Sequence, residues 1–578
     1  MKDLKFFEII KQNKILEKEL KAPLYNITII SNIVINQIKD VIEYKFRTDG
    51  VNAKVRIGEY DNIMQDSIKY SNSNLLLVFW EMSNFNEGIY YNIESYDKKK
   101  LVEFIEAKKV EIDLLINNLV KSPLVLFNKF DSTPFTNSNI GYSNFEFVMN
   151  ELNFHLENNI TKNIKLINIK SIYNNISLSN SIDIRTYYTS KILYTVQFLK
   201  DYTNLIAPFI MSANGKAKKA LIFDCDNTLW KGVLGEDGFD KIEMSINSKN
   251  GIYFNQVQKL AMNLSKKGVI IGLCSKNNES DVQNVIENHA DFKIKNQSIL
   301  IKKVNWLDKV TNLQNISKEL NIGLDSIVFI DDSSFEVNHV KSQLPQVEVI
   351  QVPEKLSEYP ALMNKVSNLF YNLSNTKEDT LRNSMYSDNL KRKSHQKKYK
   401  NIDAYLASLG LVVEVSKDDQ QNISRISQMT QKTNQFNLTT KRYTENDVKQ
   451  FLESSEHIVY SFSVSDKFGS NGITALAIIN IEDKIAIIDT FLMSCRIIGR
   501  NIEFSIMNFI ISELRLLKIE TLRSSYIEST KNIQVKRFYD DCSFQNILVS
   551  KSQSDYKLKI IDYKPTEINY IKLLNNGN

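Results

Sequence analysis

An apolar run that ends in two closely spaced carboxylates stands near the middle of the sequence. The segment 221–238 reads LIFDCDNTLWKGVLGEDG, so three apolar residues lead into Asp224, and Asp226 follows two positions later. A buried strand that ends in this way is costly unless a cation or a proton offsets the repulsion between the carboxylates. A capped turn, in which Asp226 and Thr228 bond nearby backbone N–H groups, is the alternative that this segment alone leaves open.

Two further apolar runs within residues 217–372 also end in polar side chains. The run GVIIGLCS ends at Ser275, and the run SIVFIDD ends at Asp331 and Asp332. Helical patterns separate these runs, at 254–268, 281–290 and 309–320. This alternation predicts a parallel α/β sheet, in which the carboxyl ends of the strands share one edge. The polar side chains are therefore expected to meet at that edge.

The groups expected at this edge suit phosphoryl transfer through an aspartyl phosphate. Asp224 would attack phosphorus, while Asp226 would protonate the leaving oxygen and later activate water. Ser275 and Lys309, which opens a helix after the string NWLD, would hold the phosphoryl oxygens. Taken singly, a terminal serine is usually a helix cap and an Asp-Asp pair a turn, but four such pieces in this order favour catalysis. The candidate ligands of a Mg²⁺ ion are four carboxylates: Asp224, Asp226, Asp331 and Asp332.

The spacing of these groups predicts an open site. Too few residues separate Asp224 from Ser275, and Ser275 from Lys309, to hold a cap domain. Without a lid, a tethered arm or a protein partner could reach the carboxylates. Of the pair at 331–332, we favour Asp332 as the direct metal ligand, with Asp331 in support.

Residues 1–210 predict a separate, doubly wound α/β domain. Strand-like runs alternate there with helical patterns; the strands are expected at 24–31, 51–58, 74–80, 123–130 and 164–172, and the helices at 34–46, 98–120 and 144–158. Such a sheet could carry a hydrolase site, with Ser31 after the first strand and the distant His155. Because Ser31 lacks a Gly-Asp-Ser context and His155 falls on a helical stretch, we expect a recognition or assembly domain without catalysis.

The C-terminal part predicts a charged helical connector at 376–400 and an α+β domain at 401–578. The alternating strings IVYSFSVSDKF and ITALAIINIEDKIAIIDTFLMS predict antiparallel strands, the second broken by a turn at Glu482-Asp483. The following string CRIIGRNIEFSIMNFIISELRLL becomes helical. The basic run KRKSHQKKYK at 391–400 is interpreted as a solvated helix face or linker.

Composition argues against several classes of partner. The formal charge of +6 arises from 73 basic and 67 acidic residues spread along 578 positions, which does not indicate a nucleic-acid partner. No apolar run approaches the roughly 18 residues that span a bilayer, so no membrane association is expected. The four cysteines include no C-x-x-C pair and form no disulfide framework. We expect a reduced, cytoplasmic protein.

The motifs DCDNT, the strand-terminal Ser275, Lys309 and IDD at 330–332 match the four motifs of the haloacid dehalogenase superfamily. The longer strings DCDNTLWKGVLGEDG, NWLDKVTNLQNI, LDSIVFIDDSSFEV, TQKTNQFNLTT and FLMSCRIIGR resemble the FkbH-like family, over essentially the whole chain. The resemblance implies an N-terminal SGNH-hydrolase-like domain, a capless Rossmann-like phosphatase core and a C-terminal acetyltransferase-like (GNAT-like) domain. Lys231 and Ser333-Ser334 depart from the family pattern at positions that are not proposed ligands.

The same resemblance implies an activity. FkbH-like proteins take the phosphoglyceryl group of 1,3-bisphosphoglycerate, remove phosphate and place a glyceryl unit on an acyl carrier protein, in secondary-metabolite or surface-polymer pathways. The expected partners are therefore a phosphorylated three-carbon substrate and the phosphopantetheine arm of a carrier. A plain phosphatase of a small or protein-bound phosphate is the alternative, and a scaffold with a silent core is a third.

The C-terminal domain holds the remaining candidate residues. Arg496, Gly499 and Arg500 resemble the R-x-x-G-x-G/A turn with which acetyltransferase-like folds bind a pyrophosphate, although Asn501 replaces the final small residue. An ordinary strand-to-helix turn with solvated arginines is the alternative.

A thiol could carry the acyl group. The candidates are Cys495, beside the arginine turn, and Cys225, between the catalytic aspartates, although the strand pleat could point Cys225 into the core. A buried structural cysteine is the default for either position, and Cys274 and Cys542 are interpreted as structural.

Overall fold

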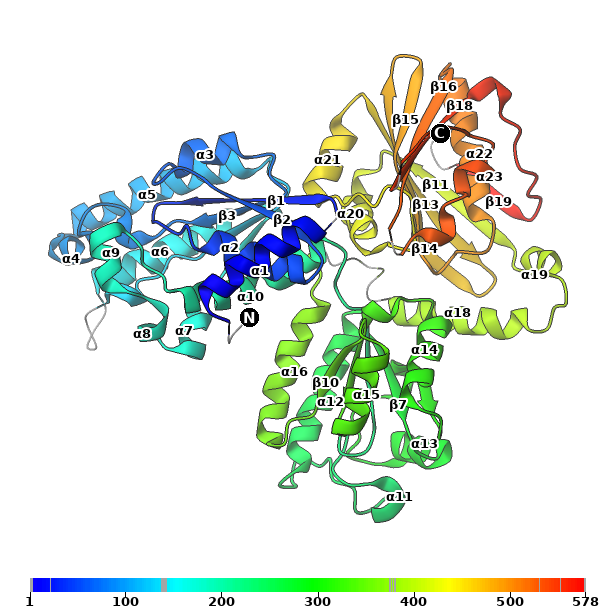
Figure 1. The fold of residues 1–578 in the computed structure, drawn as a ribbon, viewed down its shortest axis with the longest axis horizontal. Coiled ribbons are helices and arrows are strands. Elements are labelled where there is room, and N and C mark those ends of the chain that lie inside the picture. Colours follow the sequence, from blue (N-terminus) through cyan, green and yellow to red (C-terminus); the bar gives the residue numbers. More distant parts are fainter. Residues whose placement is uncertain are drawn as a thin grey trace. The chain divides into compact units, whose positions relative to one another are not determined.

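Figure 1 shows the computed structural model, which describes residues 4–575 except 21, 137–142, 374–375, 377, 379–380, 530 and 551. The chain divides into two compact units. The first comprises Met1–Ile210 and Tyr443–Asp447, and the second comprises Met211–Arg442 and Val448–Asn578. Among the described residues, none of the helices is long and apolar enough to span a bilayer.

The first unit is built on a five-stranded parallel sheet in the order β2-β1-β3-β4-β5. Its strands are β1 (Leu24–Ser31), β2 (Asn52–Ile57), β3 (Leu75–Phe79), β4 (Val125–Asn128) and β5 (Ile164–Ile167). The helices of this region are α1 (Phe6–Glu19), α2 (Ile38–Thr48), α3 (Ile63–Lys69), α4 (Ile89–Asn92), α5 (Lys98–Leu119), α6 (Asn144–Asn159), α7 (Lys170–Ile176), α8 (Leu178–Ser181), α9 (Ile184–Ser190) and α10 (Val196–Ala213). The doubly wound architecture expected from the sequence is confirmed.

One expected strand of this unit is shorter than predicted. The run 164–172 remains extended only as far as Ile167 and then continues as α7. The side chain of Asn168 accepts a hydrogen bond of 3.2 Å from the backbone N–H of Lys170. An asparagine that bonds the backbone two residues on turns the chain, and this turn ends the strand.

Ser31 and His155 are engaged separately in this unit. The hydroxyl of Ser31 donates to the Ile33 carbonyl at 2.9 Å and accepts from the Ile33 N–H at 3.1 Å. His155 on α6 lies 2.7 Å from a carboxylate oxygen of Asp113 on α5. Each side chain therefore has a local structural partner.

The central part of the second unit is a parallel sheet in the order β10-β9-β6-β7-β8. Its strands are β6 (Ala220–Phe223), β7 (Ile270–Ser275), β8 (Ile299–Val304), β9 (Ile327–Asp331) and β10 (Glu348–Gln351). The accompanying helices are α11 (Leu234–Asp237), α12 (Gly251–Lys266), α13 (Glu279–Asn288), α14 (Lys309–Leu320), α15 (Ser334–Gln343) and α16 (Tyr359–Ser367).

The three inner strands of this sheet are buried along their whole length. Alternate side chains enter separate apolar clusters on its two faces, with Leu221 and Phe223 in one and Ala220 and Ile222 in the other. Strands covered by helices on both faces have continuous apolar runs, which is why the sequence predicted them. Only α11 and α12 lie between β6 and β7, so this interval contains no cap domain.

The C-terminal part of the second unit contains a mixed sheet in the order β17-β18-β16-β15-β14-β13-β11-β19. Its strands are β11 (Leu411–Lys417), β12 (Phe436–Asn437), β13 (His457–Asp466), β14 (Gly469–Glu482), β15 (Ile485–Met493), β16 (Thr521–Ile527), β17 (Gln545–Val549), β18 (Gln553–Lys559) and β19 (Ile571–Asn575). The helices from the connector onward are α18 (Arg382–Gln396), α19 (Ile402–Ser408), α20 (Ile423–Lys432), α21 (Glu445–Glu453), α22 (Ile502–Leu516) and α23 (Phe538–Asp541). Antiparallel strands β13, β14 and β15 precede α22, so the expected α+β class is confirmed.

Candidate active site

The predicted residues of the central sheet meet at the carboxyl ends of its inner strands. Asp224 directly follows β6, while Ser275 and Asp331 are the last residues of β7 and β9. The backbone N–H of Asp224 donates to the Ile330 carbonyl at 2.9 Å, which fixes the end of β6 against β9. Strand pairing therefore places these side chains together, although more than 100 residues separate Asp224 from Asp331.

Lys309 lies between two of the carboxylates. Its Nζ is 3.1 Å from Oδ1 of Asp224 and 2.5 Å from Oδ2 of Asp331. The position of Lys309 follows from a helix cap, because the carboxylate of Asp308 accepts the Thr311 N–H at 2.8 Å and starts α14 at Lys309. The ammonium group and both carboxylates are buried.

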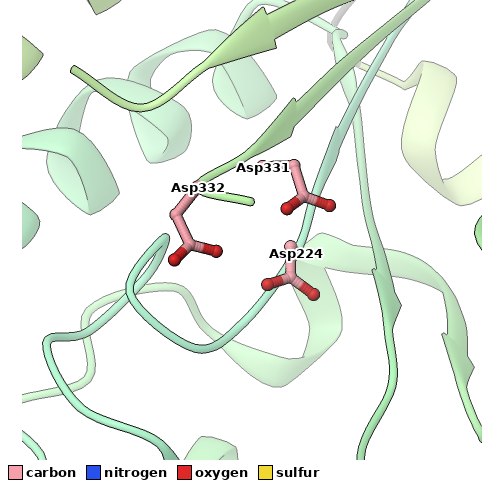
Figure 2. A group of neighbouring side chains, drawn as sticks. All are labelled: Asp224, Asp331 and Asp332. Atoms are coloured by element: carbon pink, nitrogen blue, oxygen red, sulfur yellow. The ribbon is translucent and has the colours of Figure 1, made fainter. Parts of the chain in front are cut away.

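Three carboxylates surround a space that suits a divalent cation (Figure 2). One oxygen each of Asp224, Asp331 and Asp332 lies within 4.8 Å of the others. Hard carboxylate oxygens of this kind are the ligands that Mg²⁺ prefers, usually together with water and substrate phosphate. The donor set therefore fits Mg²⁺, and all three residues were predicted ligands.

Asp226, the fourth predicted metal ligand, has its carboxylate directed elsewhere. Its Oδ1 accepts the indole N–H of Trp230 at 2.9 Å and the backbone N–H of Leu234 at 3.0 Å. Its Oδ2 accepts the amide N–H of Asn277 at 2.8 Å. Among the described residues, the cation-binding group comprises Asp224, Asp331 and Asp332 without Asp226. The surrounding loop thus holds the Asp226 carboxylate through three donors, apart from these three carboxylates, and the role of Asp226 at the metal stays a prediction.

The electrostatics of the site reflect burial and charge pairing. Burial raises the pKa of Asp224 to about 7, an effect that the Lys309 ammonium opposes and Asp331 reinforces. Burial and the neighbouring Asp331 also raise the pKa of Asp332. Burial alone would lower the pKa of Lys309, but Asp224 and Asp331 raise it above its usual range. Lys309 is therefore a permanent cation, and a further cation would favour the ionised form of Asp224.

Trp230 and Asn277 contact a predicted catalytic group but were not predicted as site residues. Trp230 is fully buried, and Asn277 is 6% exposed. The amide of Asn277 also donates to the Ser275 hydroxyl at 3.3 Å. The signal that could have identified Asn277 is its position two residues beyond the strand-terminal serine.

The cysteines differ in accessibility. Cys225, Cys274 and Cys542 are buried, whereas Cys495 is partly exposed. The side chain of Cys225 packs in the apolar cluster beneath β6, and burial raises the pKa of its thiol well above the usual value. Cys495 lines a cavity of about 710 Å³ in the second unit, with Arg425, Arg496 and Lys531 among the lining residues. Of the two candidate thiols, Cys495 is the accessible one.

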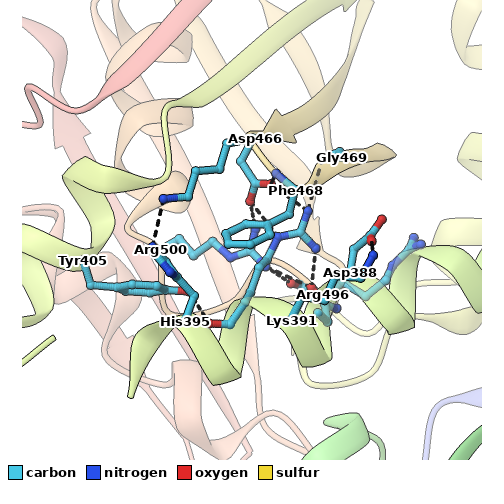
Figure 3. Close-up of polar contacts among 12 residues, drawn as sticks. Asp388, Lys391, His395, Tyr405, Asp466, Phe468, Gly469, Arg496 and Arg500 are labelled. Carbon is cyan, nitrogen blue, oxygen red and sulfur yellow. Dashed lines mark hydrogen bonds and ion pairs between the residues drawn. The ribbon is translucent and has the colours of Figure 1, made fainter. Parts of the chain in front are cut away.

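Both arginines of the predicted pyrophosphate turn are engaged within the protein (Figure 3), and Arg496 donates to the Ser494 hydroxyl at 3.1 Å. Arg500 is 8% exposed and contacts Asp466 on β13 at 3.3 Å and the Asn389 side chain on α18 at 3.2 Å. Arg392 on α18 also binds Asp466, through bonds of 2.7 and 2.8 Å. Arg392 belongs to the basic run that we interpreted as solvated, yet it is 2% exposed, because the buried Asp466 carboxylate holds it. Gly499 has a φ of 81° in the turn before α22.

A short internal segment fills the gap beside β15. β15 and β16 pair only as far as Ile488 and Ser524. Beyond that point, Phe436 and Asn437 of β12 pair with β15. The next residue, Leu438, donates to the Phe491 carbonyl at 3.2 Å and accepts from the Ile527 N–H at 2.8 Å. The backbone groups that an extended arm could pair with are thus used by the chain itself.

No family model and no curated protein matches the chain. A solved structure, the N-terminal part of the protein BF1531 from Bacteroides fragilis containing a phosphatase domain complexed with Mg, matches at 24% identity and a TM-score of 0.56. That match covers 64% of this chain and 100% of the other. The ribosomal-protein-S18-alanine N-acetyltransferase from Escherichia coli matches at 12% identity and a TM-score of 0.21, covering 26% of this chain and 94% of its own. An N-acetyltransferase from Staphylococcus aureus Mu50 matches at 18% identity and 0.21, over 26% of this chain and 99% of its own. The TM-scores of the two acetyltransferases are too low to support any argument about the C-terminal sheet. The comparison therefore shows a shared fold with the phosphatase-containing structure alone.

Proposed function

We propose that the central sheet carries a Mg²⁺-dependent phosphatase site of the haloacid dehalogenase type. The observation that carries this proposal is the buried arrangement of Asp224, Lys309 and Asp331 at the strand ends, with Asp332 and Ser275 beside it. The Mg that accompanies the phosphatase domain of the BF1531 structure supports the choice of metal.

The residues of this site have distinct roles in the proposed reaction. The Asp224 carboxylate attacks phosphorus, and Lys309 and Ser275 hold the phosphoryl oxygens. Asp226 gives a proton to the leaving oxygen, and in the second step it takes a proton from the water that hydrolyses the aspartyl phosphate. A Mg²⁺ ion bound by Asp224, Asp331 and Asp332 would supply charge neutralisation for the phosphoryl group.

The full reaction that we propose is transfer of a glyceryl unit from 1,3-bisphosphoglycerate to an acyl carrier protein. A thiol displaces the acyl phosphate as inorganic phosphate, and hydrolysis at the central site removes the phosphate ester. The open site favours a substrate that a carrier delivers from outside. Trp306 and Phe335, which lie close to Lys309 and Asp332 in the sequence, have exposed side chains that such a carrier could contact. The accessible Cys495 offers a thiol for the acyl group. These features support transfer in addition to the FkbH-like motifs.

A phosphatase without acyl transfer is the second candidate. Two observations in the C-terminal domain favour it: β12 fills the gap beside β15, and Arg500 binds Asp466. Because these backbone and side-chain groups already have partners within the protein, fewer groups are left to bind a phosphopantetheine arm.

Mass spectrometry of candidate carriers separates the two functions. The protein is incubated with Mg²⁺, 1,3-bisphosphoglycerate and phosphopantetheinylated carrier proteins, and both released phosphate and carrier mass are measured. Transfer predicts a glyceryl mass gain on one carrier. Phosphate release without a mass gain on any carrier would establish the plain phosphatase, and no Mg²⁺-dependent phosphate release from any phosphate ester would refute both.

A further inference from the structure

The two carboxylate oxygens of Asp226 have unequal hydrogen-bonding capacity left. Each carboxylate oxygen has two lone pairs in the plane of the group. Both lone pairs of Oδ1 are used, by Trp230 Nε1 at 2.9 Å and by the Leu234 N–H at 3.0 Å. From the part of the chain that the structure describes, Oδ2 accepts one bond, from Asn277 at 2.8 Å, and therefore retains one lone pair. A proton carried by Asp226 belongs on Oδ2.

Asn277 connects this oxygen to the group that holds the phosphoryl oxygens. Its amide Nδ2 lies 2.8 Å from Oδ2 of Asp226 and 3.3 Å from Oγ of Ser275. Asn277 is 6% exposed and Ser275 is 1% exposed, so few other positions are open to either side chain. The amide thereby fixes the Asp226 carboxylate relative to the Ser275 hydroxyl, which is the proposed phosphoryl-binding group.

We propose that Asn277 is a positioning residue, which aims Oδ2 of Asp226 at the leaving oxygen of a phosphate ester. This inference rests on the proposed phosphatase activity and assigns a further residue to it. In the first step, a bond forms between Asp224 and phosphorus while the ester P–O bond breaks, and the proton on Oδ2 passes to the leaving oxygen. In the second step, water adds to phosphorus, its proton returns to Oδ2, and the bond between Asp224 and phosphorus breaks.

Loss of this alignment has a characteristic kinetic signature. Leaving groups that are stable as anions, such as 2,4-dinitrophenolate, need no proton, whereas an alkoxide does. Asn277→Leu keeps the approximate size of the side chain but removes the amide donor. We expect kcat/KM for alkyl phosphates, which reports the first step, to fall about 10- to 100-fold, within the range of general acid catalysis, while kcat/KM for 2,4-dinitrophenyl phosphate changes by less than about twofold.

The test measures kcat and KM of the full-length protein with Mg²⁺ for a series running from 2,4-dinitrophenyl phosphate through phenyl phosphate to glycerol phosphate. Asn278→Leu is the matched control, because Asn278 is exposed and its amide donates to Asp281 rather than Asp226. The control should retain the wild-type dependence on the leaving group. In an Asp226→Asn background, Asn277→Leu should cause no further loss with glycerol phosphate, because the two residues act through one proton.

The outcomes separate this inference from the proposed function. A steeper dependence on the leaving group in Asn277→Leu alone supports the positioning role. An equal loss of kcat/KM for all substrates, an additive loss in the double variant or an unchanged profile would each overturn it while leaving the phosphatase assignment intact. A wild-type protein that hydrolyses none of the esters would instead refute the proposed function, and this inference with it.

Discussion

The buried ammonium of Lys309 is central to the stability of the candidate site as well as to its chemistry. It lies 3.1 Å from Asp224 and 2.5 Å from Asp331, and all three side chains are at most 8% exposed. Removing one partner of a buried ion pair leaves uncompensated charge and costs about 3–5 kcal/mol. The carboxylates would then depend more strongly on a bound cation.

Lys309→Met is expected to lower the free energy of unfolding by about 3 kcal/mol in the absence of Mg²⁺. Added Mg²⁺ should recover part of this loss, because it binds the folded state through the same carboxylates. Urea unfolding with and without Mg²⁺ measures both effects. Lys303→Met is the control, since Lys303 pairs with the partly exposed Glu319 and should change stability by less than about 1 kcal/mol. Equal losses of stability in Lys309→Met and Lys303→Met would contradict the view that Lys309 compensates two buried carboxylates.

The proposed role of Asp224 as the nucleophile is tested by an isosteric change. Asp224→Asn keeps the shape of the side chain but removes the attacking oxygen, so phosphate release should fall by at least about 10³-fold. Phosphate release under saturating Mg²⁺ is the measurement, with the far-UV circular dichroism spectrum as the check on folding. Substantial residual turnover would remove Asp224 from this role.

A buried carboxyl group in the first unit predicts a pH-dependent stability. Glu81 is 5% exposed, and Tyr194 donates a hydrogen bond of 2.6 Å to its carboxyl group. Burial raises the pKa of Glu81 from 4.5 to about 7, and the neighbouring Asp131 adds to this effect. The folded state therefore binds the proton more tightly than the unfolded state. The contribution of the protonated Glu81 side chain to folding stability is fully present below pH 4.5 and is lost as the pH rises to 7.

Glu81→Gln should remove this dependence, because glutamine resembles the protonated acid. Relative to the variant, the wild type should lose about 3 kcal/mol of unfolding free energy between pH 4.5 and pH 7.5. Urea unfolding of both proteins across this range gives the difference and cancels the titration of other carboxylates. Parallel stability curves for the two proteins would show that Glu81 titrates normally.

At the scale of the elements, α18 is attached to the β13–β14 hairpin by a buried charge cluster. Arg392 and Arg500 both bind Asp466, whose side chain is completely buried. Asp466→Asn should therefore leave two poorly compensated guanidinium groups and cost about 3–5 kcal/mol. Thermal unfolding measures the loss. Glu520→Gln, which disturbs the exposed pair with Lys484, should cost less than about 1 kcal/mol, and a similar small cost for Asp466→Asn would contradict this view of the cluster.

The elements that the sequence predicts well are those with one dominant physical constraint. β6, β7 and β9 are buried on both faces and therefore have continuous apolar runs. β8 and β10 lie at the edges of the same sheet, are partly exposed, and have mixed runs that the sequence did not identify. β12 was missed because its two residues depend on a gap between strands distant in sequence.

The same distinction applies to the site. Asp224, Ser275 and Asp331 are strand-terminal residues, so their meeting follows from the parallel sheet alone. The contact between Asp226 and Asn277 depends on how two loops turn after their strands, and apolar periodicity carries no information about that. Residue type and strand position thus indicate the reacting groups, whereas their supporting contacts require the structure.

At the scale of the whole molecule, the proposed reaction divides between two sites. In this proposal the carboxylates of the central sheet carry out the phosphoryl chemistry, and Cys495 in the C-terminal domain is the thiol that would receive the acyl group. A variant that damages only one site should therefore uncouple phosphate release from carrier loading. Cys225, although next to Asp224 in sequence, packs in the core and is not expected to accept the acyl group.

Cys495→Ala is expected to retain phosphate release from simple phosphate esters within about twofold but to abolish the mass gain on a carrier protein. The physical reason is that an acyl-accepting thiol must be reachable: Cys495 is partly exposed, whereas Cys225 is buried and burial raises the pKa of its thiol. Cys225→Ala is the matched control and should retain carrier loading if its folding is intact. Iodoacetamide treatment of the native protein, followed by peptide mass mapping, should modify Cys495 well before the three buried cysteines. Loss of loading in Cys225→Ala together with full loading in Cys495→Ala would transfer the acyl-accepting role to the central domain.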